Sequence, residues 1–188
     1  MDEPRWLDEA EDRAWRGYMR MRTLLNARIV RDLGREAGLS EPDYDVLSTL
    51  SEIEGRRWRL QELAAHMAWS KSRLSHHITR MEQRGLVTRE ECTADGRGAF
   101  VVLTGAGLRA IEAAAPGHVA SVRRHFIDHL SREQLDALAE IAETVVGHLN
   151  DHREDASQAR HGGGVYVQRN RMSPPAGRPS TLPRRPRG

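Results

Sequence analysis

Apolar residues recur at the spacing of an amphipathic α-helix in three long stretches of the chain. In about residues 7–34 they fall three, four or seven positions apart, which predicts one long helix. The stretch of about 108–126 repeats the pattern but contains Pro116, which is expected to kink or break the helix. After Ser131 a capping-box pattern, SREQ, opens a third helix whose apolar positions alternate spacings of three and four up to Leu149. The apolar stripe that this spacing forms along the third helix needs a partner helix, in this chain or in another.

Shorter segments between the first two long helices predict a helix-turn-helix. Ser40 is suited to cap a helix that ends before Gly55, and residues 61–67 form a short apolar helix. Ser70 can cap the next helix, and Gly85 follows it at the position where a left-handed residue commonly ends a helix. Two short helices joined by a tight turn form the helix-turn-helix motif.

The pattern changes after Gly85 to one that is typical of β-strands. Residues 86–89 and 99–103 are rich in β-formers, and the ADGRG run between them is turn material. This predicts a two-stranded hairpin, attached to the helix-turn-helix as a wing. The predicted fold class is therefore mainly α with a small β-hairpin wing, a winged helix-turn-helix.

The helix that begins after Ser70 carries the candidate functional surface. If Leu74, Ile78 and Met81 face the core, the helical period turns hydroxyl, imidazole, amide and cationic groups to the other side. Hydroxyl and amide groups can bond base edges in the major groove, and cations can reach guanine or phosphate. The side chains of this helix that we expect to contact DNA are Ser70, Lys71, Ser72, Arg73, Ser75, His76, Thr79, Arg80 and Gln83.

The predicted turn of the wing places Arg97 between two glycines. A slim tip with one guanidinium can reach a minor groove, where the negative potential attracts arginine. Asp95 is expected to pair with Arg97 or to cap the turn, which would fix the direction of the guanidinium. The alternative is an ordinary hairpin turn with a solvated arginine.

Charge is unevenly distributed, although the formal net charge is only +2. Residues 56–89 hold eight bases and two acids, whereas the rest of the chain up to residue 150 is acidic. A concentrated basic segment is an electrostatic footprint for a polyanion. Residues 151–188 hold eight arginines, three acids and several glycines and prolines, which predicts a disordered basic tail. That tail would either add nonspecific phosphate contacts or act as a spacer.

The order and spacing of these motifs resemble the MarR (multiple antibiotic resistance regulator) family of transcription factors over about residues 6–150. The resemblance implies a homodimer with a DNA-binding lobe over about 40–104 and dimerisation helices over about 6–34 and 105–150. It also implies a small organic effector, often an anion, bound between the lobe and the dimerisation helices. The matching residues are Leu63, Ala64, Ser70, Leu74, Ser75, Arg80, Met81, Glu82, Gly85, Leu86, Val87, Arg89, Asp95, Gly96, Arg97, Leu103, Thr104 and Gly107.

Three aromatic or sulfur-containing side chains of the first helix, Trp15, Tyr18 and Met19, are candidates to line an effector pocket, with plain packing as the alternative. Cys92 would be a redox trigger only across a dimer, because the chain has no second cysteine.

Histidines offer two further hypotheses. His125 and His129 have the spacing of a zinc pair, but the arginines beside them would repel a cation, so a solvated helix face is preferred and no metal is predicted. His76 and His77 are placed on the DNA face, His77 toward its edge, where they would make DNA contact sensitive to pH.

The preferred function is a homodimeric, sequence-specific regulator of transcription, a repressor released by a small-molecule effector. Two-fold symmetry predicts an inverted-repeat operator with half-sites about one turn, ~10 bp, apart. The alternative is an architectural DNA-binding protein without a specific operator. An enzyme is not supported, since we find no Gly-rich phosphate loop and no nucleophile with an evident base, and no cofactor is predicted. A single cysteine and the lack of a signal peptide or a membrane-spanning run favour a cytoplasmic, nucleoid-associated protein.

Overall fold

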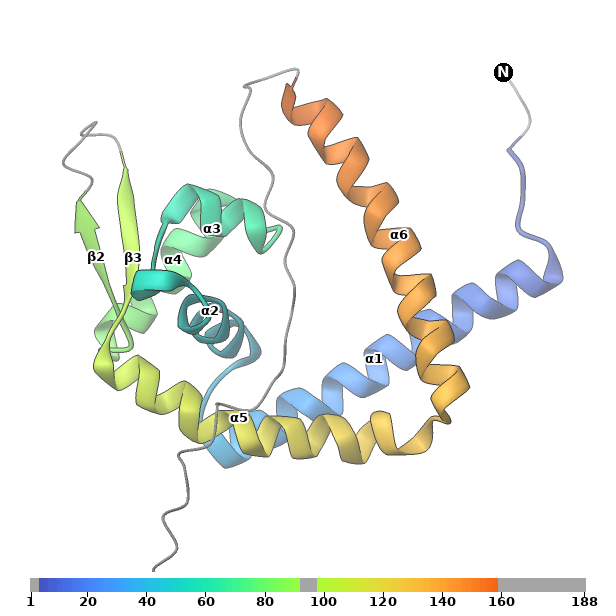
Figure 1. Ribbon diagram of the computed structural model, residues 1–188, viewed down its shortest axis with the longest axis horizontal. Coiled ribbons are helices and arrows are strands. Elements are labelled where there is room, and N and C mark those ends of the chain that lie inside the picture. Colours follow the sequence, from blue (N-terminus) through green and yellow to red (C-terminus); the bar gives the residue numbers. More distant parts are fainter. Residues whose placement is uncertain (1–3, 92–97, 159–188) are drawn as a thin grey trace, which may run out of the picture. The chain divides into compact units, whose positions relative to one another are not determined.

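The computed structural model describes residues 4–91 and 98–158, which form six α-helices, two short 3-10 helices and three strands (Figure 1). In chain order these are α1 (Glu9–Ala37), α2 (Glu41–Ser51), η1 (Glu54–Arg56), β1 (Arg57–Arg59), α3 (Leu60–His66), α4 (Lys71–Gln83), β2 (Val87–Glu91), β3 (Ala99–Leu103), α5 (Gly105–His125), η2 (Ile127–His129) and α6 (Arg132–Gln158). The chain divides into two compact units, residues 1–136 and 137–188. The helix-turn-helix and the wing both lie in the first unit. The predicted fold class, mainly α with a small β wing, is confirmed.

Side-chain caps define where several of these helices begin. Ser40 accepts from the backbone N–H of Asp43, and the Asp43 carboxylate accepts from that of Ser40, so that the two residues form a capping box before α2. Ser131 and Gln134 exchange the same two bonds before α6, which confirms the predicted capping box. The first helix continues beyond the predicted residue 34 and ends at Gly38, whose φ of 63° is left-handed.

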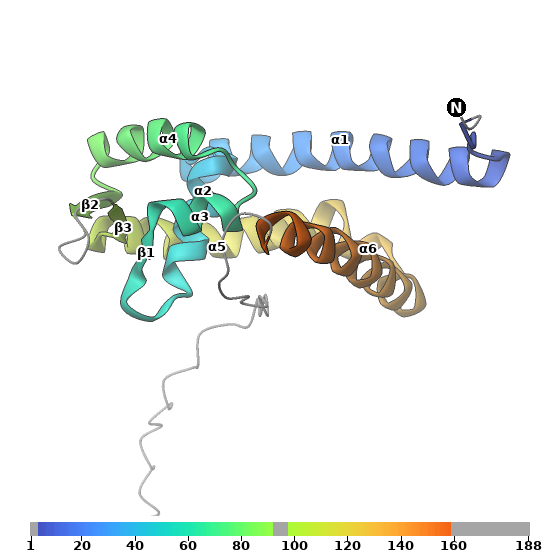
Figure 2. The same cartoon turned by 90° about the horizontal axis from the view of Figure 1, so that it is seen from above.

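The wing is a three-stranded antiparallel sheet in the order β1-β3-β2. The predicted hairpin of β2 and β3 is confirmed, with Arg89 opposite Val101. The third strand, β1, was not predicted, because three residues are too few to show an alternating pattern. It pairs with the other edge of β3 (Figure 2). Trp58 therefore also lies opposite Val101.

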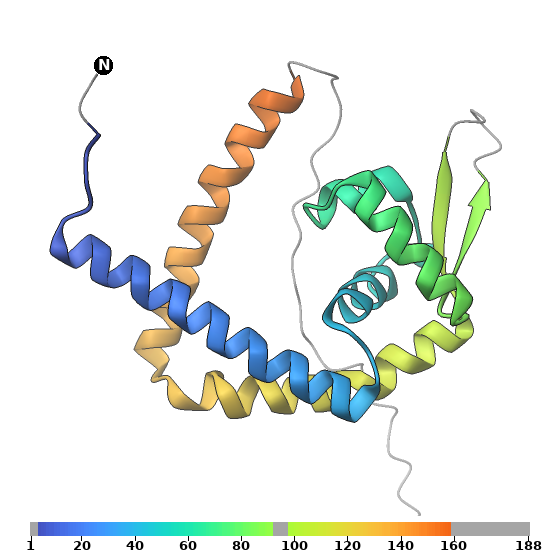
Figure 3. The same cartoon turned by 180° about the vertical axis from the view of Figure 1, so that it is seen from behind.

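The core of the first unit lies between α2, α3, α4, the start of α5 and the sheet. Its fully buried apolar side chains come from all of these elements except α5, which contributes Ile111 and Ala114 at a few per cent exposure. In Figure 3, α4 lies beside the strands, and its contacts with β2 and α3 agree with this view. The most deeply buried residues include Val46, Leu47, Leu50, Leu63, Leu74, Ile78, Met81, Val87 and Val101.

The helix α5 begins where the chain leaves the sheet, and its start is closely packed. Thr104 caps it by accepting from the N–H of Gly107, and the Thr104 hydroxyl also lies within bonding distance of the carbonyl oxygens of Gly85 and Leu86. A Cβ at Gly107 would overlap the carbonyl oxygen of Leu86. Only glycine therefore allows this backbone contact without a shift of the chain.

The helices α5 and α6 differ from their predicted forms, α5 in its continuity and α6 in its length. Pro116 does not break α5, which is continuous from Gly105 to His125. Pro116 and Glu112 are both exposed, so the carbonyl that loses its helical donor can bond to water instead. The helix α6 extends to Gln158, beyond residue 150, where the domain was predicted to end. The rest of the predicted basic tail lies outside the described residues.

The described part of α6 in the second unit leaves large apolar side chains in solvent. Ile141, Val145, Val146 and Leu149 are each at least half exposed in the single chain. Among residues 4–91 and 98–158, no helix is apolar over enough residues to cross a membrane.

Candidate nucleic-acid interface

The helix α4 presents one apolar and one polar face, as its sequence predicts. Ser70 caps it by accepting from the N–H of Arg73 at 3.2 Å. Leu74, Ile78 and Met81 are fully buried, which confirms the predicted core face. The apolar face anchors the helix, so that the opposite face is left free for a partner.

The predicted contact residues of α4 and its cap lie on that opposite face or along its edges. Ser70, Lys71, Ser72, Arg73, His76, Thr79, Arg80 and Gln83 are exposed, and Ser75 is half-buried. The nearest acid on this helix, Glu82, is half-buried and lies 2.8 Å from the guanidinium of Arg89. This face therefore offers donors and cations with little opposing negative charge.

Arg89, on β2, clamps the wing to α4 in a way that sequence spacing alone did not show. Its backbone N–H and Nη1 donate to Glu82 at 2.9 and 2.8 Å. Its Nη2 donates to the Ser75 carbonyl at 2.7 Å and to the Thr79 hydroxyl at 2.9 Å. Thr79 itself donates to the Ser75 carbonyl, so its hydroxyl has only one acceptor site left for DNA. The hint in the sequence was an acid and a base seven residues apart, on either side of a glycine turn.

The structure corrects the predicted place of His77. Its side chain is only 7% exposed and faces α2, whereas His76 is exposed on the polar face. The helical rotation of 100° per residue separates these two neighbours. His77 Nε2 lies 3.1 Å from Asp43 Oδ1, and Arg84 donates to Asp43 Oδ2 at 2.6 Å. His77 therefore belongs to the contact between α2 and α4 and not to the surface.

Burial and charge act on both ionisable groups of that contact. Burial lowers the pKa of His77 below its ordinary value, and this effect outweighs the nearby Asp43 carboxylate. Burial by itself would raise the pKa of Asp43, but bonds from Arg84 and Ser40 bring it below its usual range. Near neutral pH, His77 is therefore neutral and Asp43 is a carboxylate.

The edge strand of the wing adds cations beside α4. The guanidiniums of Arg57 and Arg59 lie 4.1 and 5.4 Å from the centre of the Phe100 ring. A hollow of about 380 Å³ lies between the wing and α4, and Arg59, Lys71 and Arg89 contribute to its lining. The predicted wing-tip residues Asp95 and Arg97, like Cys92, lie outside the described residues.

The three candidate effector residues are not gathered around one hollow in the single chain. Trp15 and Tyr18 are about half exposed with ring centres 5.9 Å apart, and Met19 is half-buried. Trp15 lines a shallow hollow of about 440 Å³ together with Trp6, Leu7, Asp12 and Arg16, and neither Tyr18 nor Met19 lines it. Their role therefore stays a hypothesis that depends on what covers this face.

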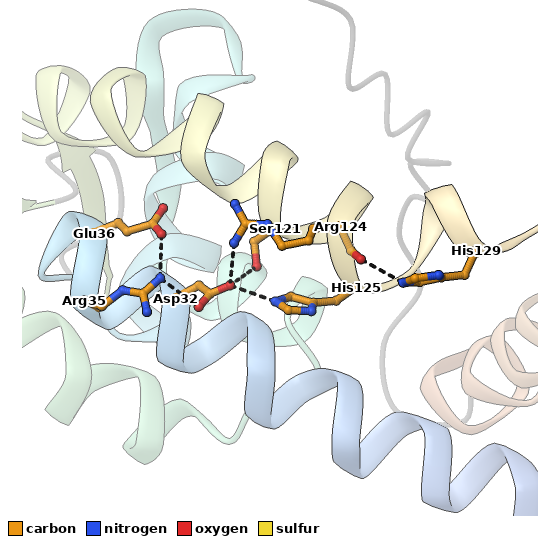
Figure 4. Close-up of polar contacts among 7 residues, drawn as sticks. All are labelled: Asp32, Arg35, Glu36, Ser121, Arg124, His125 and His129. Atoms are coloured by element: carbon orange, nitrogen blue, oxygen red, sulfur yellow. Dashed lines mark hydrogen bonds and ion pairs between the residues drawn. The ribbon is translucent and has the colours of Figure 1, made fainter.

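A polar cluster joins α1 to α5 and engages both histidines of the hypothetical zinc pair (Figure 4). The Asp32 carboxylate accepts from the Ser121 hydroxyl at 2.8 Å and lies 2.9 Å from His125 Nε2, while His129 Nε2 lies 2.9 Å from the Arg124 carbonyl. The contacts with Ser121 and His125 lower the pKa of Asp32. The two imidazoles thus face different partners, and α5 ends at His125, so they do not share a helix face.

Known proteins are similar to this chain in both sequence and fold. The model of the MarR family matches residues 39–98. The transcriptional regulator HosA of Escherichia coli is 31% identical over 128 residues, which cover 67% of this chain and 91% of HosA.

Two solved structures from Streptomyces coelicolor are similar over most of their length. The MarR-family transcriptional regulator AbsC is 47% identical with a TM-score of 0.74, covering 79% of this chain and 99% of AbsC. Sco3205, a MarR-family transcriptional regulator in complex with DNA, is 42% identical with a TM-score of 0.75, covering 79% of this chain and 93% of Sco3205. The chain therefore belongs to the MarR family of transcriptional regulators.

Proposed function

We propose that this protein binds double-stranded DNA as a homodimer and represses transcription at an inverted-repeat operator, from which a small organic effector releases it. The observation that carries the proposal is the exposed face of α4. It combines hydroxyl, imidazole, amide and guanidinium groups, and Arg89 neutralises its nearest acid. A helix of this chemistry suits the major groove. Sco3205, which is 42% identical to this chain, was solved in complex with DNA, and this supports DNA binding as the function.

Roles on this face follow from which groups are still free to bond. His76 and Gln83 are exposed and well suited to base edges, while Lys71 and Arg73 near the N-terminus of α4 suit phosphates. Thr79 is expected to contribute little base reading, because its hydroxyl already has two partners. Arg97 is proposed to enter the adjacent minor groove, with Asp95 fixing its direction.

Homodimer formation is supported by apolar side chains that the single chain leaves in solvent. Trp15, Tyr18 and Leu24 on α1 are each about half exposed, as are Val145 and Leu149 on α6. Such patches mark interaction surfaces in soluble proteins. Sedimentation of the purified protein should give the mass of two chains, and Val145→Asp should shift it toward one chain. A wild-type monomer that still binds DNA tightly would contradict the dimeric operator complex.

The effector is proposed to bind near Trp15, Tyr18 and Met19, in a space that a second chain would help to enclose. The Trp15–Tyr18 ring pair offers a flat apolar surface, and Arg22 lies 5.8 Å from the centre of the Tyr18 ring. An aromatic carboxylate fits this combination of rings and positive charge. A panel of such acids should include at least one that weakens DNA binding by wild type but not by Trp15→Ala.

The direct test is selection of bound sequences from a random double-stranded DNA pool at near-physiological salt. The proposal predicts an enriched inverted repeat, bound roughly 10³-fold or more above random DNA. DNA binding without enrichment would favour the architectural alternative.

Arg73→Ala should lower the salt slope of binding by about one. Arg123→Ala is the control, because it removes an equal positive charge from α5 and not from α4. It should leave the slope unchanged.

A further inference from the structure

The buried histidine of α4 is in contact with one of the arginines predicted to meet DNA. Arg80 Nη2 lies 3.1 Å from His77 Nδ1. Because a guanidinium can only donate, His77 Nδ1 must be the acceptor and must carry no proton. The imidazole proton is therefore on Nε2, the atom that faces Asp43 Oδ1 at 3.1 Å. That N–H is not aligned well enough for a hydrogen bond, so its attraction to Asp43 is mainly electrostatic.

The imidazole is held on its other sides as well. The Trp69 ring meets it edge to face, with the ring centres 5.7 Å apart and an interplanar angle of 86°. The side chain is only 7% exposed, so the ring has little room to rotate. Asp43 is itself fixed by Ser40 and Arg84, and Arg84 also donates to the Gly38 carbonyl. The start of α2 thus determines where His77 Nδ1 points.

We propose that His77 is a positioning residue for DNA binding, whose neutral Nδ1 holds the Arg80 guanidinium in place on the DNA-facing helix. The inference rests on the proposed function and deepens it, since it assigns a role to a side chain that does not touch DNA. Arg80 is exposed and has a long side chain, and ordering such a side chain on binding costs roughly 0.5–1.5 kcal/mol. An arginine that is already ordered avoids that cost, which corresponds to about 2- to 10-fold in affinity.

Protonation of His77 would end this arrangement. It would place a proton on Nδ1, where Arg80 now donates, and a positive charge beside Arg80. The charged groups that face the imidazole are Asp43 from α2, Arg80 from α4 and Arg84, which follows the last residue of α4. Two cations and burial oppose protonation, and one carboxylate favours it. Release of Arg80 is therefore expected only below the ordinary pKa range of histidine.

Two neutral substitutions separate the two sides of the imidazole. His77→Asn places an amide oxygen near the position of Nδ1 and can still accept from Arg80. His77→Gln places its amide near the position of Nε2 and can face Asp43, but it removes the acceptor. We expect His77→Gln to weaken binding of the selected operator by about 2- to 10-fold and His77→Asn to retain most of the affinity. In an Arg80→Ala background, His77→Gln should have no further effect, a result that a general structural defect would not produce.

A second measurement avoids any change in the core. The ratio of operator affinities between wild type and Arg80→Ala should fall as the pH is lowered through the pKa of His77, which burial keeps below its ordinary value, because acid releases Arg80 in the wild type. His76 is also exposed on this face, but it is present in both proteins and its effect cancels in the ratio. A ratio that does not change over a pH range in which NMR shows His77 becoming protonated, or equal affinities of wild type and a folded His77→Gln, would overturn the positioning role while leaving the proposed function intact. Failure of the wild type to select any DNA sequence would overturn the proposed function instead.

Discussion

Gly107→Ala tests the close approach between the start of α5 and the turn that precedes β2. A Cβ at this position would overlap the Leu86 carbonyl oxygen and would lie 2.8 Å from Leu103 Cδ1. Ordinary carbon–carbon contacts are about 3.5–4.0 Å, so both neighbours would have to move. One of them is backbone, which cannot turn aside as the end of a flexible side chain can.

The cost can be worked out from these contacts. Overpacking of this kind costs about 1–3 kcal/mol. The Leu86 carbonyl also accepts from the Thr104 N–H at 3.2 Å and lies 3.0 Å from the Thr104 hydroxyl. Its displacement would weaken bonds that each contribute about 1 kcal/mol. Alanine regains up to about 1 kcal/mol of helix propensity. The net expectation is a loss of about 2 kcal/mol in the free energy of unfolding.

Urea unfolding followed by circular dichroism measures this loss, at one protein concentration because association is linked to folding. Gly34→Ala is the matched control, since Gly34 is an exposed helical position with no atom within 4 Å of a built Cβ. That variant should be as stable as the wild type or gain up to about 1 kcal/mol. If Gly107→Ala unfolds at the same urea concentration as Gly34→Ala, the inferred close contact is wrong.

Three further variants probe the core, the buried acid and the cap of α4. Leu47→Ala should lower the free energy of unfolding by about 2–5 kcal/mol, and a loss below 1 kcal/mol in urea would mean the site is loosely packed. The lowered pKa of Asp43 means that its carboxylate stabilises the fold above about pH 4, the unfolded value, and that this is lost as pH falls through the folded value. Asp43→Asn should therefore have a lower free energy of unfolding than wild type at neutral pH, and that free energy should decrease less on acidification. If the free energies of unfolding of the two proteins change with pH in parallel, this reasoning is wrong. Ser70→Ala should cost about 1 kcal/mol in thermal unfolding, and an unchanged melting temperature would show that the cap bond contributes nothing.

The elements of the fold were predictable where a local rule decides them. Periodicity identified the long helices, and Ser40, Ser70 and Ser131 marked helix starts because a cap bonds to residues only two or three positions away. The strand β1 was missed because its three residues are held by pairing with β3, more than 40 positions later. Continuity of α5 at Pro116 likewise depends on exposure, which the sequence does not state.

In the candidate interface, too, locally determined features were predictable and contacts between distant residues were not. The helical period was enough to separate Leu74, Ile78 and Met81 from the polar residues of α4. The partners of those polar residues were not predictable, because they come from other elements: Arg89 reaches Thr79 from β2, and Asp43 reaches His77 from α2.

By itself, the sequence determined the helix-turn-helix, the wing hairpin, the polar face of α4 and the resemblance to a family. These features depend on spacing along one segment, since a side chain's face on a helix follows from its position. Only the tertiary structure decided which polar groups on that face are already bonded and which histidine is buried. Those outcomes depend on distances between residues far apart in the chain, such as the 3.1 Å from His77 to Asp43. Such distances follow from the packing of whole elements, and no local pattern in the sequence encodes them.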